Sequence, residues 1–119
     1  MKRKVLILGG GGFIGSQIAK ILVKRKNYDL TIADDFHKNQ DDEIFNDFVN
    51  KNKIKVIKSD FTKSESFNLL DKSYDDFYML ASMIGVDNTL EIPHEIIRVN
   101  TALIYNSLEW IKPKMLSVI

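Results

Sequence analysis

The sequence predicts an α/β fold, namely a doubly wound parallel sheet with helices on both faces, truncated after about five strands. Three observations indicate this fold. Short apolar runs alternate with segments of helical periodicity, a glycine-rich loop follows the first run, and an acidic pair follows the second. Because strands that alternate with helices form parallel sheets with right-handed crossovers, the expected element order is βαβαβαβαβ.

The first part of the chain supplies two strands and the helix between them. Residues 5–8 form a continuous apolar run, which suits a strand buried on both faces. A helix is expected over residues 13–25, and the apolar residues that should face the sheet are Ile14, Ile18, Ile21 and Leu22. The second strand, at residues 30–33, ends at the acidic pair Asp34 and Asp35.

The middle of the chain predicts a second helix, a third strand and a short third helix. After a polar stretch at residues 36–42, the second helix carries on one side Ile44, Phe45, Phe48 and Val49. The third strand is expected at residues 54–57. Thr62 and Glu65 have the spacing of a capping box, in which a hydroxyl and a carboxylate satisfy free amides, so a helix should follow to about residue 71.

The last part of the chain supplies two more strands around a long helix. The fourth strand is expected at residues 76–81. Pro93 is well placed to begin the helix and Pro113 to end it. The positions that should lie on its inner side are Ile97, Asn100, Leu103, Ile104, Leu108 and Ile111. An apolar run at residues 115–119 predicts the fifth strand.

Composition excludes several classes of protein. A length of 119 residues allows one modest domain, and the net charge of +1 gives no bias toward nucleic acid or membranes. Since no apolar run approaches a membrane span or a signal peptide, we expect a cytoplasmic protein. The absence of cysteine excludes disulfides, thiolate metal sites and a cysteine nucleophile, and His37 and His94 lack metal-ligand spacing.

The glycine-rich loop predicts a phosphate site. It lies between a predicted strand and a predicted helix, where the backbone amides of the helix start attract phosphate. Gly10, Gly12 and Gly15 fit G-x-G-x-x-G, while Gly9, Gly12 and Gly15 fit G-x-x-G-x-x-G, and a run of four glycines leaves the register open. Glycines alone also mark ordinary tight turns, so the context of the loop must carry the argument.

That context is the acidic pair at the end of the second strand. Asp34 lies 19 residues after Gly15, where a carboxylate can accept hydrogen bonds from the ribose hydroxyls of a dinucleotide. Its charge would repel a 2′-phosphate, which favours NAD over NADP. Lys38 in the next loop could soften this preference, and Asp35 could share or take the role of Asp34.

A P-loop kinase or ATPase is the main competing interpretation. Gly10 and Gly15 have the separation that the motif G-x-x-x-x-G-K-[ST] requires. However, Ser16 stands where the motif needs the lysine that reaches the terminal phosphates, so triphosphate chemistry lacks its main electrostatic element.

In its glycine loop and acidic pair, the chain resembles the extended short-chain dehydrogenase/reductase family. This family contains the NAD-dependent nucleotide-sugar epimerases and dehydratases, and it has a Rossmann-type fold. Residues 9–16 are similar to its G-G-x-G-F-I-G-S opening, and Phe13 and Ile14 fill the last variable positions of that motif. The resemblance extends over the whole chain.

Four further segments carry the resemblance. Residues 34–36 are similar to the family's D-N-L strand ending, and residues 60–61 to its D-L pair that contacts adenine. Residues 78–82 are similar to its H-L-A-A segment beside the cofactor. Asn100 falls where the family has a helix asparagine that braces the active-site strand; it also interrupts an apolar helix face, and a buried amide needs hydrogen-bond partners. A structural tie between helix and loop is therefore expected there rather than direct chemistry.

The resemblance implies that residues 1–119 are one incomplete NAD(P)-binding domain with NAD as its preferred cofactor. The expected cofactor-binding residues are Gly9, Gly12, Phe13, Ile14, Gly15, Asp34, Asp35, Asp60, Phe61, Ala81, Ser82 and Asn100. No metal site and no catalytic residue are expected within the chain. In the parent enzymes a nucleotide sugar is the substrate, and the apolar segment 83–86 could line its entrance.

Two departures from the family pattern shape the functional interpretation. Lys63 stands where the family often has a second aspartate. The family's catalytic serine or threonine and its Y-x-x-x-K pair would lie beyond Ile119, and no tyrosine of this chain has a lysine four residues later. We therefore expect the cofactor-binding part of an epimerase or dehydratase that does not turn over substrate alone.

Two alternatives remain open at this point. One is a stand-alone NAD-binding sensor, or a module that depends on a partner chain, which could form a homodimer through the exposed edge of its sheet. The other is an α/β sheet that binds no ligand.

Overall fold

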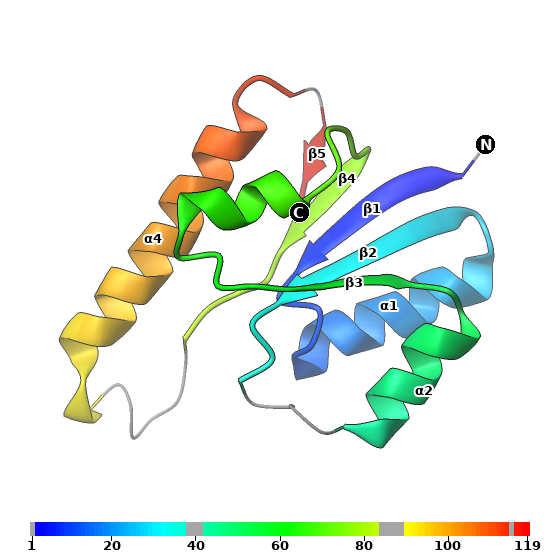
Figure 1. The fold of residues 1–119 in the computed structure, drawn as a ribbon, viewed down its shortest axis with the longest axis horizontal. Helices are drawn as coiled ribbons and strands as arrows, with labels where there is room; N and C mark the ends of the chain where they lie inside the picture. Colours follow the sequence, from blue (N-terminus) through cyan, green and yellow to red (C-terminus); the bar gives the residue numbers. More distant parts are fainter. Residues whose placement is uncertain (1, 38–41, 84–89, 115) are drawn as a thin grey trace.

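Five parallel strands form a single sheet in the order β3-β2-β1-β4-β5 (Figure 1). The computed structural model describes residues 2–37, 42–83, 90–114 and 116–119. The strands are β1 (Arg3–Leu8), β2 (Tyr28–Asp34), β3 (Lys55–Lys58), β4 (Asp76–Met79) and β5 (Ser117–Val118). From β1 the chain adds β2 and β3 on one side, then crosses to β4 and β5 on the other. The α/β, doubly wound sheet predicted from the sequence is thereby confirmed.

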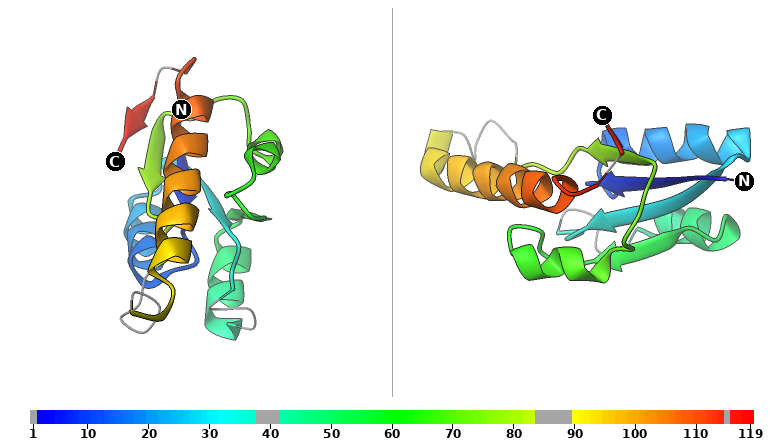
Figure 2. Two further views of the ribbon diagram at one scale, coloured as in Figure 1. Left: turned by 90° about the vertical axis from the view of Figure 1, so that its left-hand side faces the viewer. Right: turned by 90° about the horizontal axis from the view of Figure 1, so that it is seen from above.

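Helical segments cover both faces of the sheet. α1 (Phe13–Arg25) and α2 (Glu43–Lys51) pack on one face, and the 3₁₀ helix η1 (Ser64–Leu69) and α4 (Pro93–Ile111) pack on the other. In the right-hand view of Figure 2, β1 and β2 lie between α1 and η1. No helix in the described part of the chain is long and apolar enough to cross a membrane.

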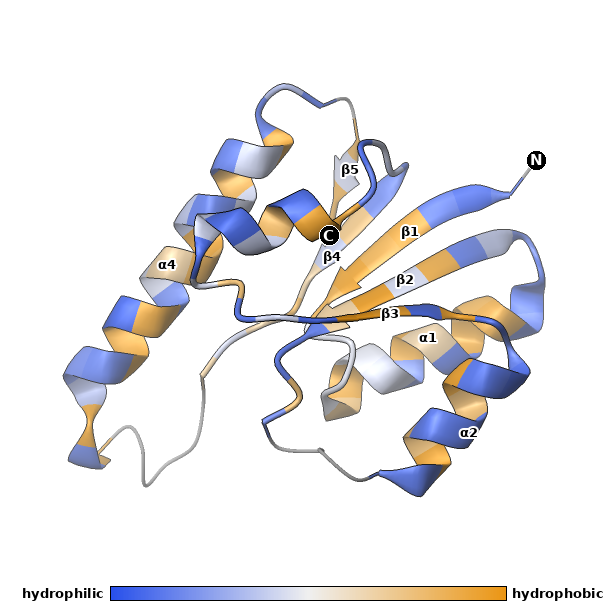
Figure 3. Cartoon of the chain, in the orientation of Figure 1, coloured by the Kyte–Doolittle hydropathy of each residue, from blue (hydrophilic) through white to orange (hydrophobic). Residues whose placement is uncertain are grey.

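The apolar run of β1 is explained by this two-sided burial. Val5 and Ile7 belong to the core beneath α1 and α2, while Leu6 and Leu8 belong to the core beneath η1 and α4. All four side chains are fully buried, and each contributes about 1.5–3 kcal/mol relative to an exposed position. β1 begins with Arg3 and Lys4, and Figure 3 shows the strand as hydrophilic at this end and hydrophobic beyond it.

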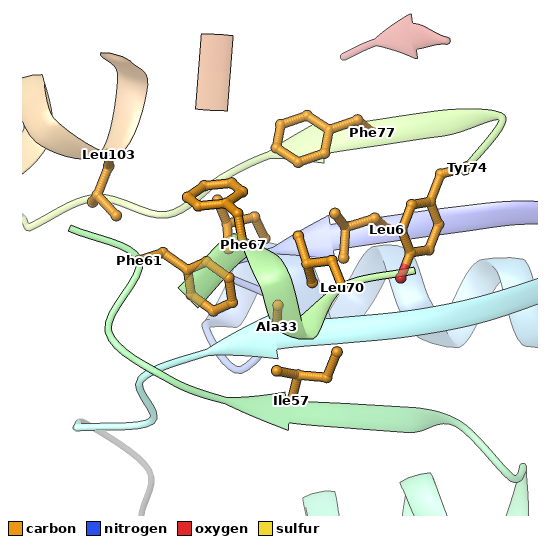
Figure 4. Packing of buried hydrophobic residues seen from close by; sticks show 10 residues of the cluster. Leu6, Ala33, Ile57, Phe61, Phe67, Leu70, Tyr74, Phe77 and Leu103 are labelled. Carbon is orange, nitrogen blue, oxygen red and sulfur yellow. The ribbon is translucent and has the colours of Figure 1, made fainter. Parts of the chain in front are cut away.

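Aromatic packing fixes α4 against its face of the sheet. The Trp110 ring lies 5.8 Å from Phe67 of η1, 6.0 Å from Tyr74 and 5.7 Å from Phe77 of β4, measured between ring centroids. Figure 4 shows these last three side chains together with Phe61, whose ring meets Phe67 edge-on at 5.1 Å. The loop that contains Phe61 is thus joined to the same core that holds α4.

The expected inner face of α1 is only partly correct. Leu22 is buried and Ile18 partly buried, but Ile14 and Ile21 are exposed. The rest of the buried face consists of Gly15 and Ala19. The helix approaches the strands through small residues, which carry little hydrophobic signal. The spacing of its large apolar residues therefore predicts the buried face only in part.

The inner face of α4 is also displaced from its expected position. Leu103 and Ser107 are its buried residues, whereas Ile97, Ile104 and Leu108 are exposed. Partly buried Val99 and Trp110 complete this side of the helix, so three of the aliphatic residues expected inside are left on the surface. Asn100 and Ile111, also expected inside, are partly buried.

The predicted capping box is wrong. η1 begins at Ser64, its N-cap residue is Lys63, and no side chain caps it. The Thr62 hydroxyl instead donates to the side chain of Asp60, two residues earlier. A local Asx-type turn therefore competes successfully with helix capping for this hydroxyl.

The strand boundaries agree with the expectation to within about two residues, and β1 and β2 each begin two residues earlier than expected. β4 stops at Met79 rather than at residue 81, and the segment that follows passes close to Gly9, where a Cβ would lie 2.6 Å from the nitrogen of Ala81. β5 is confined to Ser117–Val118, and residue 115, expected in the same strand, lies outside the described residues.

Candidate functional site

A cavity of about 600 Å³ lies at the carboxyl ends of the strands. It sits where the strand order reverses beside β1, the position at which open α/β sheets bind ligands. All of the predicted cofactor-binding residues except Asn100 line this cavity, which brings together Gly9, Gly12, Phe13, Ile14, Gly15, Asp34, Asp35, Asp60, Phe61, Ala81 and Ser82.

The structure distinguishes the roles of the loop glycines. Gly9 has a φ of +91°, and a Cβ there would lie 2.6 Å from the backbone nitrogen of Ala81. A Cβ on Gly15 would lie 2.6 Å from the carbonyl oxygen of Gly9. A Cβ on Gly12 would meet only that same oxygen, at 3.4 Å. Gly9 and Gly15 are thus needed for the fold, whereas Gly12 leaves open space. Gly10 is also tightly packed, since a Cβ there would lie 2.6 Å from the side chain of Ile32, but only Gly9 has a positive φ, which favours the register that includes Gly9.

The amino terminus of α1 is arranged to receive an anion. Gly12 is its N-cap residue in an extended conformation, no side chain caps it, and its first turn contains no acidic residue. α2 differs, because the carboxylate of Asp42 accepts a hydrogen bond from the amide of Phe45 at 3.0 Å. Since helix starts present unsatisfied amides and partial positive charge, α1 offers both to the cavity.

Asp34 connects β2 to the glycine loop. Its Oδ2 accepts a hydrogen bond from the amide of Gly11 at 2.9 Å, and its Oδ1 accepts one from the amide of Phe36 at 3.0 Å. Burial raises the pKa of Asp34 above its usual range, and these two hydrogen bonds oppose the rise only in part. The carboxylate thus stands partly buried at the wall of the cavity.

Asp35 has a different environment. Its Oδ1 lies 2.9 Å from Nδ1 of His37 and accepts the backbone amide of His37 at 3.2 Å. Burial alone would raise the pKa of Asp35, but the bonds from His37 outweigh it and hold this pKa below its usual range. The two neighbouring carboxylates therefore differ in acidity, and Asp34 is the more buried of them.

Phe36 is a site residue that sequence reasoning missed. It was expected in a polar stretch, yet it is only 9% exposed and packs against Phe45 with ring centroids 5.6 Å apart. Its φ of +57° lies in the left-handed region, which a bulky residue rarely adopts. A Cβ on Gly11 would lie 2.6 Å from its ring, so Phe36 supports the underside of the glycine loop. The signal available in the sequence was a single aromatic residue among polar neighbours.

The loop after β3 forms another wall of the cavity. Asp60 is exposed there, and its Oδ1 accepts hydrogen bonds from the amide of Thr62 at 3.0 Å and from its hydroxyl at 2.6 Å. The ring of Phe61 points into the core instead, with 3% of the residue exposed. Thr62 lines the cavity as well and was not among the residues expected there.

Asn100 holds the segment after β4 without lining the cavity. Its Oδ1 accepts the amide of Met83 at 2.7 Å, and its Nδ2 donates to the carbonyl oxygen of Met83 at 3.1 Å. The amide is satisfied on both sides, as expected for a structural tie between helix and loop. Met83 itself lines the cavity, while residues 84–86 and Lys38 lie outside the described residues.

The sequence that forms this site matches a known family. Residues 5–118 match the model of the NAD dependent epimerase/dehydratase family. The chain belongs to this family. The expected resemblance to NAD-dependent epimerases and dehydratases is thereby confirmed, and the chain corresponds to their NAD-binding portion.

Relatives of this epimerase/dehydratase chain are longer than it is. A UDP-N-acetyl-alpha-D-glucosaminuronate decarboxylase of Bacillus cytotoxicus is 36% identical over 100 residues, which cover 84% of this chain and 30% of that protein. The chain thus spans about a third of the length of the relatives that it matches.

Solved structures share the fold. The UDP-Glc/GlcNAc 4-epimerase from Campylobacter jejuni superimposes with a TM-score of 0.82 at 23% identity, covering 93% of this chain and 34% of that one. The Thermus thermophilus UDP-glucose 4-epimerase in complex with NAD gives a TM-score of 0.75 at 22% identity, covering 92% and 34%.

The residues of this epimerase/dehydratase chain fit NAD. Open space beside Gly12 and an uncapped helix start suit a pyrophosphate, and the Asp34 carboxylate at the cavity wall is of the type that accepts from ribose hydroxyls. Among the described residues, no group of three histidine, cysteine or acidic side chains could hold a metal ion.

Proposed function

We propose that this chain binds NAD as the cofactor-binding portion of an enzyme that acts on a nucleotide sugar. The observation that carries the proposal is the position of one cavity between the open, uncapped start of α1 and the carboxylate of Asp34. Relatives with UDP-sugars in their names support the substrate class.

Each wall of the cavity has a part in this proposal. The pyrophosphate lies over Gly12, next to Phe13, Ile14 and the start of α1. Asp34 accepts from the adenosine ribose, with Asp35 beside it, and the loop at Asp60 faces the adenine. Ala81 and Ser82 lie beside the rest of the cofactor.

NAD supplies hydride transfer when it is bound, and this chain supplies position and electrostatics. Its residues hold the dinucleotide and place negative charge beside the ribose. We propose that the groups that act on the sugar lie in sequence outside the 119 residues. Purified chain of 119 residues is then expected to show no epimerase, dehydratase or dehydrogenase turnover with UDP-sugars and NAD.

The preference for NAD over NADP rests on Asp34 and Asp35. Two carboxylates at the ribose wall would face the 2′-phosphate of NADP with like charge and would have to be desolvated against it. NAD presents hydroxyl donors at the same place. We therefore propose that NAD binds at least tenfold more tightly than NADP.

Calorimetric titration of the chain with NAD and with NADP tests both parts of the proposal. Saturable binding of NAD with weaker binding of NADP is the expected result. Tighter binding of NADP than of NAD would overturn the role of Asp34. If neither dinucleotide bound, the alternative of an α/β sheet that binds no ligand would be favoured.

A second candidate is a stand-alone NAD sensor that dimerises through its sheet. The observation that favours it is the exposed β5 edge, where Val118 and Ile119 are 54% and 59% exposed. Measurement of the intact mass of the protein in its native cells separates the candidates. A mass well above that of 119 residues supports the enzyme portion, and a matching mass supports the sensor.

A further inference from the structure

The loop after β3 is held by side chains from η1 and from α4. Asn106 of α4 donates from Nδ2 to the carbonyl oxygens of Thr62 at 2.8 Å and of Phe61 at 3.3 Å. Ser66 of η1 donates from its hydroxyl to the carbonyl oxygen of Asp60 at 2.6 Å. The carbonyl groups of three successive residues thus each accept a side-chain hydrogen bond.

Thr62 fixes the orientation of the Asp60 carboxylate within this loop. Both its amide and its hydroxyl donate to the same oxygen, Oδ1. No hydrogen bond from another described residue ends on Oδ2. Asp60 is exposed and lines the cavity, so one carboxylate oxygen is anchored and the other is left for a donor from outside the chain.

A carboxylate oxygen selects hydrogen-bond donors. The exocyclic amino group of adenine donates two hydrogen atoms, whereas hypoxanthine carries a carbonyl oxygen at the same position, which a carboxylate repels. A carboxylate that is fixed in one orientation discriminates between these bases more sharply than one that rotates freely, because no ordering of the side chain is needed on binding.

We propose that Thr62 and Asn106 are positioning residues for adenine recognition. Thr62 orients the Asp60 carboxylate, and Asn106 holds the backbone on which both residues sit at the wall of the cavity. This inference rests on the proposed binding of NAD and extends it to the residues that set base specificity.

Comparison of NAD with nicotinamide hypoxanthine dinucleotide tests the proposal, because the two ligands differ only at the base. The measured quantity is the ratio of the two dissociation constants, determined by calorimetry. A residue that only stabilises the fold would weaken both ligands together and leave the ratio unchanged. A positioning residue changes the ratio itself.

The expected results differ among four variants. The wild-type chain prefers NAD by about tenfold or more, which corresponds to a hydrogen bond to a charged group. Thr62→Val and Asn106→Asp bring the ratio to within about threefold of unity, because the first removes the hydroxyl donor and the second the amide donor. Thr62→Ser, which keeps the hydroxyl, retains the preference, as does Asn50→Asp, a matched charge change on the exposed side of α2.

The outcomes separate this inference from the proposed function. A wild-type chain that binds NAD but shows no preference overturns the inference alone, and so does an unchanged ratio in Thr62→Val. A wild-type chain that binds neither dinucleotide overturns both. A cooperative thermal unfolding transition checks that each variant is folded. If Thr62→Val does not fold, Asn106→Asp still tests the inference.

Discussion

At the scale of single residues, Asp34 has a structural role and, in the proposed function, a binding role as well. Its carboxylate accepts two backbone amides that shape the glycine loop, and it also stands at the cavity. Burial raises its pKa, so the folded protein holds the proton more tightly than the unfolded chain does. The stability that Asp34 contributes is therefore present below its unfolded pKa and lost as the pH rises through its folded pKa.

The affinity for NAD should depend on pH in the opposite sense to this stability contribution. The ionised carboxylate accepts the ribose hydroxyls, so affinity is full above the folded pKa of Asp34 and falls as the pH drops through it. Because that pKa is raised, the loss begins at a higher pH than the value of about 4 typical of an exposed aspartate. Calorimetric titration with NAD at several values between pH 7 and pH 4 measures how the dissociation constant changes.

The matching variant is Asp34→Asn, which should bind NAD about 10- to 100-fold more weakly at pH 7, since hydrogen bonds to charged groups contribute about 1.5–3 kcal/mol. Its affinity should also vary less with pH. A variant with the same affinity and pH dependence as the wild-type chain would contradict the role of Asp34.

Two glycines of one loop should respond in opposite ways to alanine. Gly12→Ala meets only ordinary contacts, so its melting temperature should stay within about 2 °C while its NAD affinity falls at least tenfold. Gly15→Ala places a Cβ 2.6 Å from the carbonyl oxygen of Gly9, and overpacking of this kind costs about 1–3 kcal/mol. Thermal unfolding and NAD titration of both variants provide the comparison. Equal loss of stability in the two would show that Gly12 is also a folding residue.

At the scale of elements, α4 links the core to the cavity. Its inner side carries Trp110, which packs against three aromatic rings, and Asn100 and Asn106, which hold the segments after β4 and β3. The position of both walls therefore depends on how this helix is seated. The exposed aliphatic residues on its other side take no part in that seating.

Truncation of the two sides of α4 should reveal the difference. Trp110→Ala removes a partly buried ring that joins α4, η1 and β4, so truncation should cost about 3 kcal/mol, the lower end of the range for core aromatic side chains. Leu108→Ala, at a position 59% exposed, should change stability by less than about 0.5 kcal/mol. Urea unfolding measures both values. Similar values for the two variants would mean that α4 is seated differently.

At the scale of the whole molecule, the two edges of the sheet differ. The β3 edge carries Lys55 and Lys58, and charged side chains of this kind discourage strand pairing. The β5 edge carries exposed Val118 and is followed by exposed Ile119. The β5 edge is thus apolar and lacks the charged residues that protect the β3 edge. It is the edge at which we expect two copies of the chain to associate.

The second candidate function predicts self-association through this edge. Sedimentation of the 119-residue chain should show a mass that rises from monomer to dimer with concentration, and Val118→Lys should abolish the rise. Leu69→Lys is the control, since Leu69 is comparably exposed on η1 and lies away from the edge. A chain that stays monomeric at high concentration would argue against this interpretation.

The sequence by itself determined the order of elements, the parallel sheet and much of the wall of the cavity. These features depend on local patterns: apolar runs with two-sided burial in β1, glycines at fixed spacing, and an acidic residue at the end of β2. Such patterns are readable because each occupies a short stretch of the sequence. The positions of Gly15 and Asp34 were predictable for that reason, whereas the run of four glycines left the choice between Gly9 and Gly10 open.

Only the tertiary structure decided the faces of α1 and α4, the burial of Phe36 and the supports of the Asp60 loop. Small residues let α1 approach the sheet, so its buried face carries little hydrophobic signal. The bond from Asn106 to Thr62 joins residues 44 positions apart. Contacts of this kind arise from the packing of one element on another, and no periodicity in the sequence encodes them.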